Sequence, residues 1–197
     1  MGHSYTVPGF TVFMDVASSI VQEGKVSNLF DNSLERAGEK HYITGVSAIN
    51  FPTSKNTGGW HFLNYFDLDR GIFRVSLSGI HYPDTNKYFG HFGVVDISNK
   101  LDALKIPHLN KVVFMATHHR AAADMLVKWA ISGKEYCTVE ADEWFPAKSD
   151  RDALANTLTL AKEKLEQDGL WVRLQSWMTS QLESGLGKTP VDGSAFH

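Results

Sequence analysis

The residues best suited to chemistry are three consecutive side chains, His118, His119 and Arg120. They lie where an apolar strand pattern ends and a helical pattern begins. A helix N-terminus carries roughly +0.5 of an elementary charge and several unpaired N–H groups, so an anion docked there would be held by the backbone and by Arg120. Two imidazoles flanking that anion would suit acid–base phosphoester chemistry. The alternative is structural: Thr117 caps the helix and Arg120 pairs with Asp124 one turn later.

The segment 111–133 must position these three residues, and it predicts a buried strand followed by an amphipathic helix. Val112 to Ala116 form a continuous apolar run, which is typical of a strand covered on both faces. From Ala121 the apolar residues recur at three- and four-residue spacing, and Gly133 is placed to cap the helix C-terminus. Strand ends of this kind are common ligand sites in α/β architectures.

Further histidines lie beside predicted strands, at His61, His81 and His91. If the ends of neighbouring strands converge, two or three of these imidazoles would meet near His118. Three imidazoles, or two with a carboxylate such as Asp84, would suit Zn²⁺. The chain has no H-E-x-x-H and no paired H-x-T or H-x-S signature. Histidines with a structural or partner-contact role are therefore the alternative.

The segment 54–59, Ser-Lys-Asn-Thr-Gly-Gly, has the composition of a phosphate cradle. Gly58 and Gly59 would let backbone N–H groups approach an anion, and Lys55 would add positive charge. A strand pattern follows it instead of a helix, so the segment is not a P-loop. An ordinary hairpin turn is the alternative reading.

The acidic stretch 140–146 places Trp144 and Phe145 beside three carboxylates. Aromatic anchors with an acidic rim are typical of a protein-contact patch, and this one would face a basic partner. The alternative is a loop whose two aromatic side chains fold back onto the following helix.

Composition narrows the class of protein. The net charge is −3 and the Lys and Arg residues are scattered, which argues against direct nucleic-acid binding and against a membrane surface. No apolar run approaches the length of a membrane span. The single cysteine, Cys137, permits no intramolecular disulfide, so we expect a reducing, cytoplasmic environment.

The remaining patterns predict an α+β fold in which one antiparallel β-sheet of about five or six strands packs against N-terminal, central and long C-terminal helices. We expect one globular domain over 1–184 and a flexible tail over 185–197. The expected elements are helical stripes in 10–37, strands in 41–51, 60–66, 72–80 and 88–97, a further strand in 136–139, and a long helix over 149–182 bent at Gly169.

These observations favour a small accessory or inhibitor protein that acts by binding another protein. Bacterial or phage proteins that block toxins or nucleases offer an analogy for this profile. A homodimer is a further arrangement that would use the same contact patch. The alternative function is a small histidine-based hydrolase or phosphoesterase at 117–120, with no cofactor expected other than Zn²⁺.

Overall fold

The computed structural model describes residues 38–51, 66–67, 72–73, 75–103 and 112–183. Several expectations lie outside these residues: the helical stripes in 10–37, the loop 54–59, most of the strand expected in 60–66, and the tail 185–197. Among the described residues, no helix has both the length and the apolar composition needed to cross a bilayer.

The described chain is mostly helical. Its helices are α2 (Gly45–Ile49), α3 (Asn86–Phe89), α4 (Ser98–Ala103), α5 (His118–Ser132), α6 (Ala141–Trp144), α7 (Lys148–Leu160), α8 (Lys162–Gln167), α9 (Trp171–Met178) and a π-helical turn, η4 (Thr179–Glu183). Its strands are β1 (Phe66–Asp67), β2 (Ile72–Phe73), β3 (Val94–Asp96) and β4 (Phe114–Ala116).

The expected antiparallel sheet of five or six strands is wrong. Among the described residues, β1 pairs only with β2 and β3 pairs only with β4, both antiparallel. Val95 stands opposite Met115 in the second pair. Single bridges join Ile43 to Met115 of β4 and to Leu77, so Ile43 links β4 to the segment around Leu77.

Two of the expected strands are instead built around single helical turns. The segment 41–51 contains α2, which follows the extended residue Thr44. The segment 88–97 begins inside α3 and keeps strand geometry only in β3. A helix of four or five residues does not complete enough turns for a 3.6-residue period to separate from a 2-residue period. Adjacent apolar residues such as Tyr88 and Phe89 are both buried within one turn, and the sequence pattern therefore resembles a strand.

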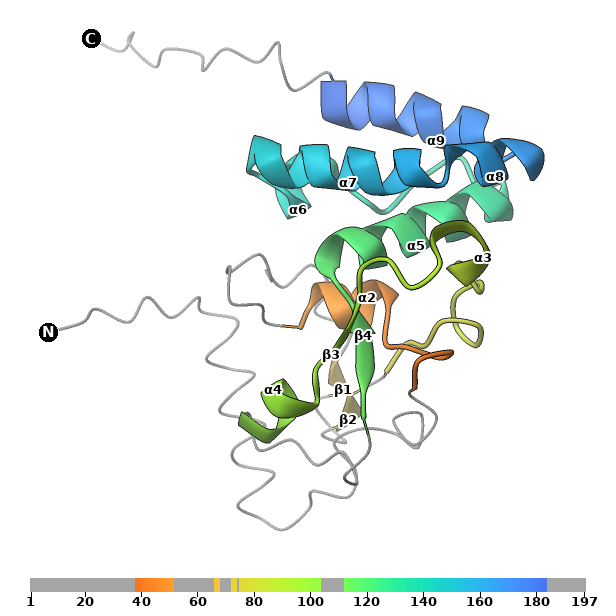
Figure 1. Ribbon diagram of the computed structural model, residues 1–197. Helices are drawn as coiled ribbons and strands as arrows, with labels where there is room; N and C mark the ends of the chain where they lie inside the picture. Colours follow the sequence, from red (N-terminus) through yellow and green to blue (C-terminus); the bar gives the residue numbers. More distant parts are fainter. Residues whose placement is uncertain (1–37, 52–65, 68–71, 74, 104–111, 184–197) are drawn as a thin grey trace, which may run out of the picture.

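Helix α5 is the centre of the structure. In Figure 1 it lies between α7, on one side, and α2 with β4, on the other, and it contacts α2, α7 and α9. Its buried residues cover almost its whole circumference, including the run Ala121, Ala122 and Ala123. A helix that is buried on almost every side belongs inside a protein, and alanines let neighbouring elements approach its backbone closely. The helix predicted in 111–133 is thus confirmed, with Gly133 as the left-handed C-cap at φ +68°. The strand before it is shorter than predicted, because only Phe114–Ala116 have strand geometry and Val112 is 54% exposed.

The single long helix expected over 149–182 is divided into three helices and the π-helical turn. The bend predicted at Gly169 is confirmed, because this residue has φ +71° and separates α8 from α9. A further break falls at Ala161, between α7 and α8. Leu158 and Leu165, from the predicted apolar stripe, are fully buried on either side of that break. No strand occurs at 136–139, where the described chain is an irregular connection between α5 and α6.

Candidate functional site

The strand–helix junction is held in place by backbone and side-chain caps. The N–H of Thr117 donates to the carbonyl of Gly93 at 2.7 Å, which ties the end of β4 to the turn before β3. The side chain of Thr117 accepts from the N–H of Arg120 and caps α5, as the structural alternative predicted. The first turn of α5 therefore already has a side-chain acceptor.

Arg120 is fully buried and its guanidinium is completely used by neighbouring groups. Its Nε donates to Asp124 at 2.9 Å, which confirms the pairing one turn along the helix. One terminal nitrogen donates to the carbonyls of Gly90 (3.0 Å) and Phe92 (2.6 Å). The other terminal nitrogen contacts acceptor oxygens of Tyr42 (2.7 Å), Thr85 (3.2 Å) and Asn86 (3.0 Å). A guanidinium has five N–H groups, so none remains for an external anion.

Asp124 completes this enclosed network. Besides Arg120, its carboxylate accepts from the hydroxyls of Thr44 and Thr85, both at 2.6 Å, and from Tyr42 at 3.0 Å. Burial raises the pKa of Asp124, while Arg120 and the threonine hydroxyls oppose that rise by favouring the ionised form. Burial, followed by the charge of Asp124, raises the pKa of Tyr42 to about 12. The network joins α5 to residues far away in the chain and functions as a structural cross-link.

The two histidines beside Arg120 have separate surroundings. His118 is buried, and its Nε2 lies 3.0 Å from the carbonyl oxygen of Phe51. The ring of His119 stacks on Phe145 with the centroids 5.2 Å apart, and its Nε2 lies 3.6 Å from a carboxylate oxygen of Asp150. Among the residues that the structure describes, the three consecutive side chains therefore contact three different parts of the chain.

The other residues singled out in the sequence are also dispersed. His81 accepts from the N–H of Leu77 through Nδ1, and His91 is exposed with Nδ1 3.7 Å from a carboxylate oxygen of Glu39. Lys55, Gly58, Gly59 and His61 lie outside the described residues. Within the described ranges, no group of three His, Cys, Asp or Glu side chains is arranged to hold a metal ion.

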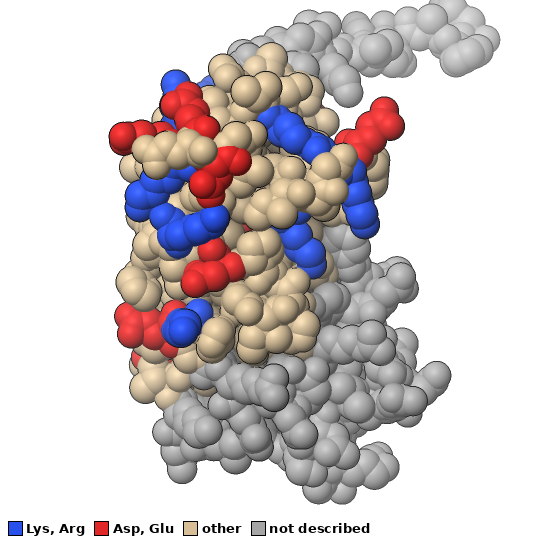
Figure 2. Space-filling view, turned by 90° about the vertical axis from the view of Figure 1, so that its right-hand side faces the viewer, with Lys and Arg blue, Asp and Glu red and all other residues tan. Residues whose placement is uncertain are grey.

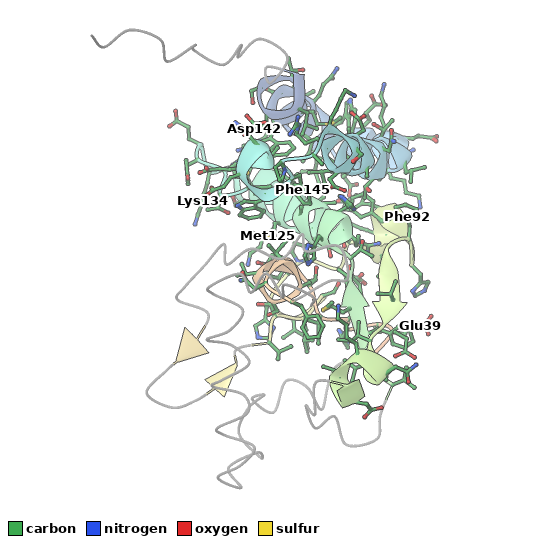
Figure 3. The ribbon with its side chains drawn as sticks, turned by 90° about the vertical axis from the view of Figure 1, so that its left-hand side faces the viewer. Glu39, Phe92, Met125, Lys134, Asp142 and Phe145 are labelled. Carbon is green, nitrogen blue, oxygen red and sulfur yellow. The ribbon has the colours of Figure 1, made fainter. Side chains whose placement is uncertain are left out.

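Trp144 and Phe145 do not form an exposed patch. They are only 4% and 1% exposed, and both belong to the hydrophobic core. The carbonyl of Phe145 accepts from Arg151 at 2.9 Å, which holds the turn between α6 and α7. In Figure 3 the labelled Phe145 lies inward, toward α5, while Asp142 of the same short segment lies toward the outside. The aromatic residues of this segment support the fold, and its carboxylates face outward.

Those carboxylates line a groove between the 134–140 connection, α6 and α9, which we call the acidic groove. It has a volume of about 590 Å³. Its walls carry Glu135, Tyr136, Cys137, Glu140, Asp142 and Glu143 on one side and Ser176, Trp177, Ser180 and Gln181 on the other, with Trp129 and Val139 completing the lining. No Lys or Arg is among these lining residues. By contrast, Figure 2 shows Lys and Arg interspersed with Asp and Glu over the helices of the face that it presents.

Helix α9 holds the irregular connection that forms this groove. The indole N–H of Trp177 donates to the carbonyl of Val139 at 3.2 Å, near one end of the connection. Arg173 donates to the carbonyl of Lys134 at the other end and stacks over the ring of Trp129, with its Cζ 4.4 Å from the ring centroid. The groove is therefore preformed by contacts from a neighbouring helix.

Tyr136 is the exposed aromatic residue of the groove, at 69% exposure. Its hydroxyl donates to a carboxylate oxygen of Glu140 at 3.1 Å, and this hydrogen bond is the main reason why the pKa of Tyr136 is raised. Cys137 is half-buried, and burial raises the pKa of its thiol. The acidic residues of 140–143 were expected from the sequence as the rim of a contact patch, but the groove was not expected. Its wall from α9 had no sequence signal because it comes from a segment about 40 residues away in the chain.

Comparison with known proteins finds no matching family model, no matching curated protein and no matching solved structure.

Proposed function

We propose that this protein binds another protein by accepting a basic, Lys- or Arg-containing segment of it in the acidic groove. The observation that carries this proposal is the acidic lining of the groove: Glu135, Glu140, Asp142 and Glu143 line it, and no Lys or Arg is among the lining residues. Asp142 also lies 3.9 Å from the guanidinium of Arg151, which does not line the groove. All four carboxylates belong to exposed residues, so they remain hydrated until a partner binds.

The energetics favour a basic partner over a neutral one. Each exposed ion pair contributes only about 0.2–1 kcal/mol, so no single carboxylate determines the affinity. Several carboxylates of one sign in a groove act together, because they attract an opposite charge over a distance of about 10 Å and raise the association rate. Tyr136 adds an aromatic face on which a guanidinium or ammonium group can stack, worth roughly 0.5–1 kcal/mol at an exposed site.

The strand–helix junction supports the histidine-based hydrolase much less well. That function needed Arg120 and the two neighbouring histidines to share a ligand. All guanidinium N–H groups of Arg120 have acceptors within the chain, at distances between 2.6 and 3.2 Å. The geometry therefore favours the binding protein.

The test uses the full chain and a panel of fluorescently labelled basic peptides that each contain one aromatic residue. Anisotropy titrations at low and high salt would compare the protein with a triple variant, Glu135→Gln, Asp142→Asn and Glu143→Gln. A matched control, Asp152→Asn, Glu163→Gln and Glu166→Gln, removes the same charge from α7 and α8. We expect the groove variant to lose about tenfold in affinity at low salt, and the control to lose less than about twofold.

Two results would contradict the proposal. One is that no basic peptide binds with a dissociation constant below about 1 mM, which is about −4 kcal/mol. The other is that the groove variant and the control variant weaken binding equally, because the interaction would then follow net charge instead of the groove. Size-exclusion chromatography at several protein concentrations separately tests whether a second copy of the chain takes the place of the partner.

A further inference from the structure

A second cavity adjoins the acidic groove and has the opposite charge. It has a volume of about 310 Å³ and is bounded by α2, the C-terminal half of α5 and the start of the 134–140 connection. Its lining includes Tyr82, Met125, Lys128, Trp129, Lys134 and Tyr136, and no carboxylate; we call it the lysine pocket. Trp129 and Tyr136 line both cavities, so one ligand lying across these two rings would contact both.

Among the described residues, neither lysine of this pocket has a carboxylate partner. Lys128 donates to the carbonyl of His81 at 2.9 Å and lies 4.2 Å from the centroid of the Tyr82 ring. Within the described residues, no carboxylate lies within ion-pair distance of Lys128 or Lys134. Burial lowers the pKa of Lys128, and the charge of Lys134 lowers it further. The two ammonium groups therefore repel each other across the pocket.

Figure 3 shows the arrangement from the side. The labelled Asp142 lies above Lys134 in this view, and Met125, another lining residue of the lysine pocket, lies below it. Negative and positive linings thus follow one another along the same part of the surface, on either side of Trp129 and Tyr136.

We infer that the lysine pocket receives an acidic side chain of the same partner segment whose basic side chains lie in the acidic groove. This inference rests on the proposed function. The partner segment would then be divided by charge, with a basic block and an acidic block separated by a short stretch that crosses Trp129 and Tyr136. A volume of about 310 Å³ is at the lower end for small ligands, so the pocket suits one or two side chains and not a folded domain.

The lysine pocket would contribute selectivity more than affinity. A uniformly basic segment long enough to cover both cavities places a cation next to Lys128 and Lys134, and that repulsion disfavours it. A segment with a carboxylate at the same place relieves the repulsion between the two lysines. Selection among basic proteins would therefore depend on the residues that flank the basic block.

The experiment uses the full chain and three labelled peptides of equal length. The first joins a block of Lys and Arg through Gly and Trp to a block of Glu, and is made in both chain directions. The second replaces the Glu block with Gln, and the third has the composition of the first in alternating order. At low salt we expect the better direction of the first peptide to bind about two- to fivefold more tightly than the second and the third.

Variants at the pocket identify the source of that advantage. Lys134 is exposed, so Lys134→Gln is expected to fold normally, to remove most of the advantage of the Glu block and to tighten binding of the second peptide. Lys162→Gln, at an exposed ion pair on α8, is the matched control and should keep the advantage. In Lys134→Glu, the second peptide should bind more tightly than the first, because the new carboxylate repels the Glu block.

The outcomes separate the two proposals. If none of the peptides binds, the proposed function and this inference both fall. If the second peptide binds through the acidic groove but the Glu block adds nothing, or if its advantage persists in Lys134→Gln, the inference about the lysine pocket is overturned and the proposed function stands.

Discussion

Both ends of α5 carry charged side chains, but the surroundings of these side chains differ. Near its N-terminus, Arg120 and Asp124 are both fully buried, and each hydrogen-bonding group of the pair has a partner inside the chain. Toward its C-terminus, Lys128 has a carbonyl and an aromatic ring for partners and faces a cavity, and Lys134, just beyond the helix, lines the same cavity. The comparison shows that charge in a sequence does not itself mark a binding site. What matters is whether neighbours within the chain already use that charge.

The largest effect should come from breaking the enclosed pair. Arg120→Met leaves the carboxylate of Asp124 buried without its cation, which should lower the free energy of unfolding by about 3–5 kcal/mol. The double variant Arg120→Met, Asp124→Leu should recover part of this loss, because it removes both charges. Urea denaturation followed by circular dichroism measures both.

The control for that prediction is Lys148→Met, which breaks an exposed pair with Asp152 on α7 and should cost no more than about 1 kcal/mol. Similar costs for Arg120→Met and Lys148→Met would show that the buried pair is not the structural cross-link described above.

The next effect tests how closely the chain packs on Arg120. Gly93 has φ +73°, and a Cβ added there would lie 2.8 Å from the Cβ of Arg120 and 3.1 Å from the hydroxyl oxygen of Thr117. Gly169 has nearly the same φ, +71°, with nothing within 4 Å of an added Cβ. Gly169→Ala should therefore cost only the backbone strain, about 1–2 kcal/mol, and Gly93→Ala about 1–3 kcal/mol more. Equal losses of unfolding free energy would mean that the turn at Gly93 can move away from α5.

Strongly alkaline pH should weaken the enclosed network. The pKa of Tyr42 is raised from 10.0 to about 12, so the folded state favours the neutral phenol. This contribution is fully present below pH 10 and is lost as the pH rises from about 10 to about 12, on the order of 3 kcal/mol in all. Tyr42→Phe should be less stable by about 1–3 kcal/mol at neutral pH and should lose less further stability above pH 10.

Tyr136→Phe, at an exposed position, is the control for this pH dependence and should keep the alkaline decline. The measurement is the free energy of unfolding in urea at pH values from 7 to 12. If the free energy of unfolding of Tyr42→Phe falls above pH 10 as much as that of the unchanged protein, groups other than Tyr42 cause the loss.

The smallest expected effect is on the rate at which the thiol of Cys137, in the acidic groove, reacts with a disulfide reagent. Burial raises the pKa of Cys137, so at pH 8 its thiol should react with a disulfide reagent more slowly than an unfolded thiol does. Because Cys137 lines the acidic groove, a bound basic peptide should slow the reaction further, by about twofold or more in proportion to its occupancy. Protein unfolded in urea gives the reference rate. A folded rate equal to that reference would place the thiol in open solvent.

The local features around α5 were predictable from the sequence because they depend on neighbouring residues. The cap by Thr117, the pair of Arg120 with Asp124 and the end of the helix at Gly133 all follow from spacings of a few residues, and all are confirmed. The partners of the pair were not predictable, since Tyr42 is 82 positions before Asp124. A pattern of neighbouring residues does not predict which distant hydroxyl groups will surround an ion pair.

The sheet was predicted wrongly because short apolar runs do not distinguish strands from single helical turns. The acidic stretch after Val139 was recognised, with its two aromatic residues either in an exposed contact patch or folded back against the protein. Trp144 and Phe145 are in the core, so the contact patch was wrong. Which members of a mixed acidic and aromatic stretch face outward depends on the elements packed against it, here the first turn of α5 through His119. The groove itself needs α9, and a sequence pattern does not place that helix.

The attachment of the 134–140 connection to α9 has a mechanical consequence. One helix fixes the connection near both ends, through Trp177 at Val139 and Arg173 at Lys134. The acidic groove and the lysine pocket consequently share one support, and a small tilt of α9 would alter the width of both together. Mutations along α9 that leave every lining charge intact should thus change the shape of the whole recognition surface at once.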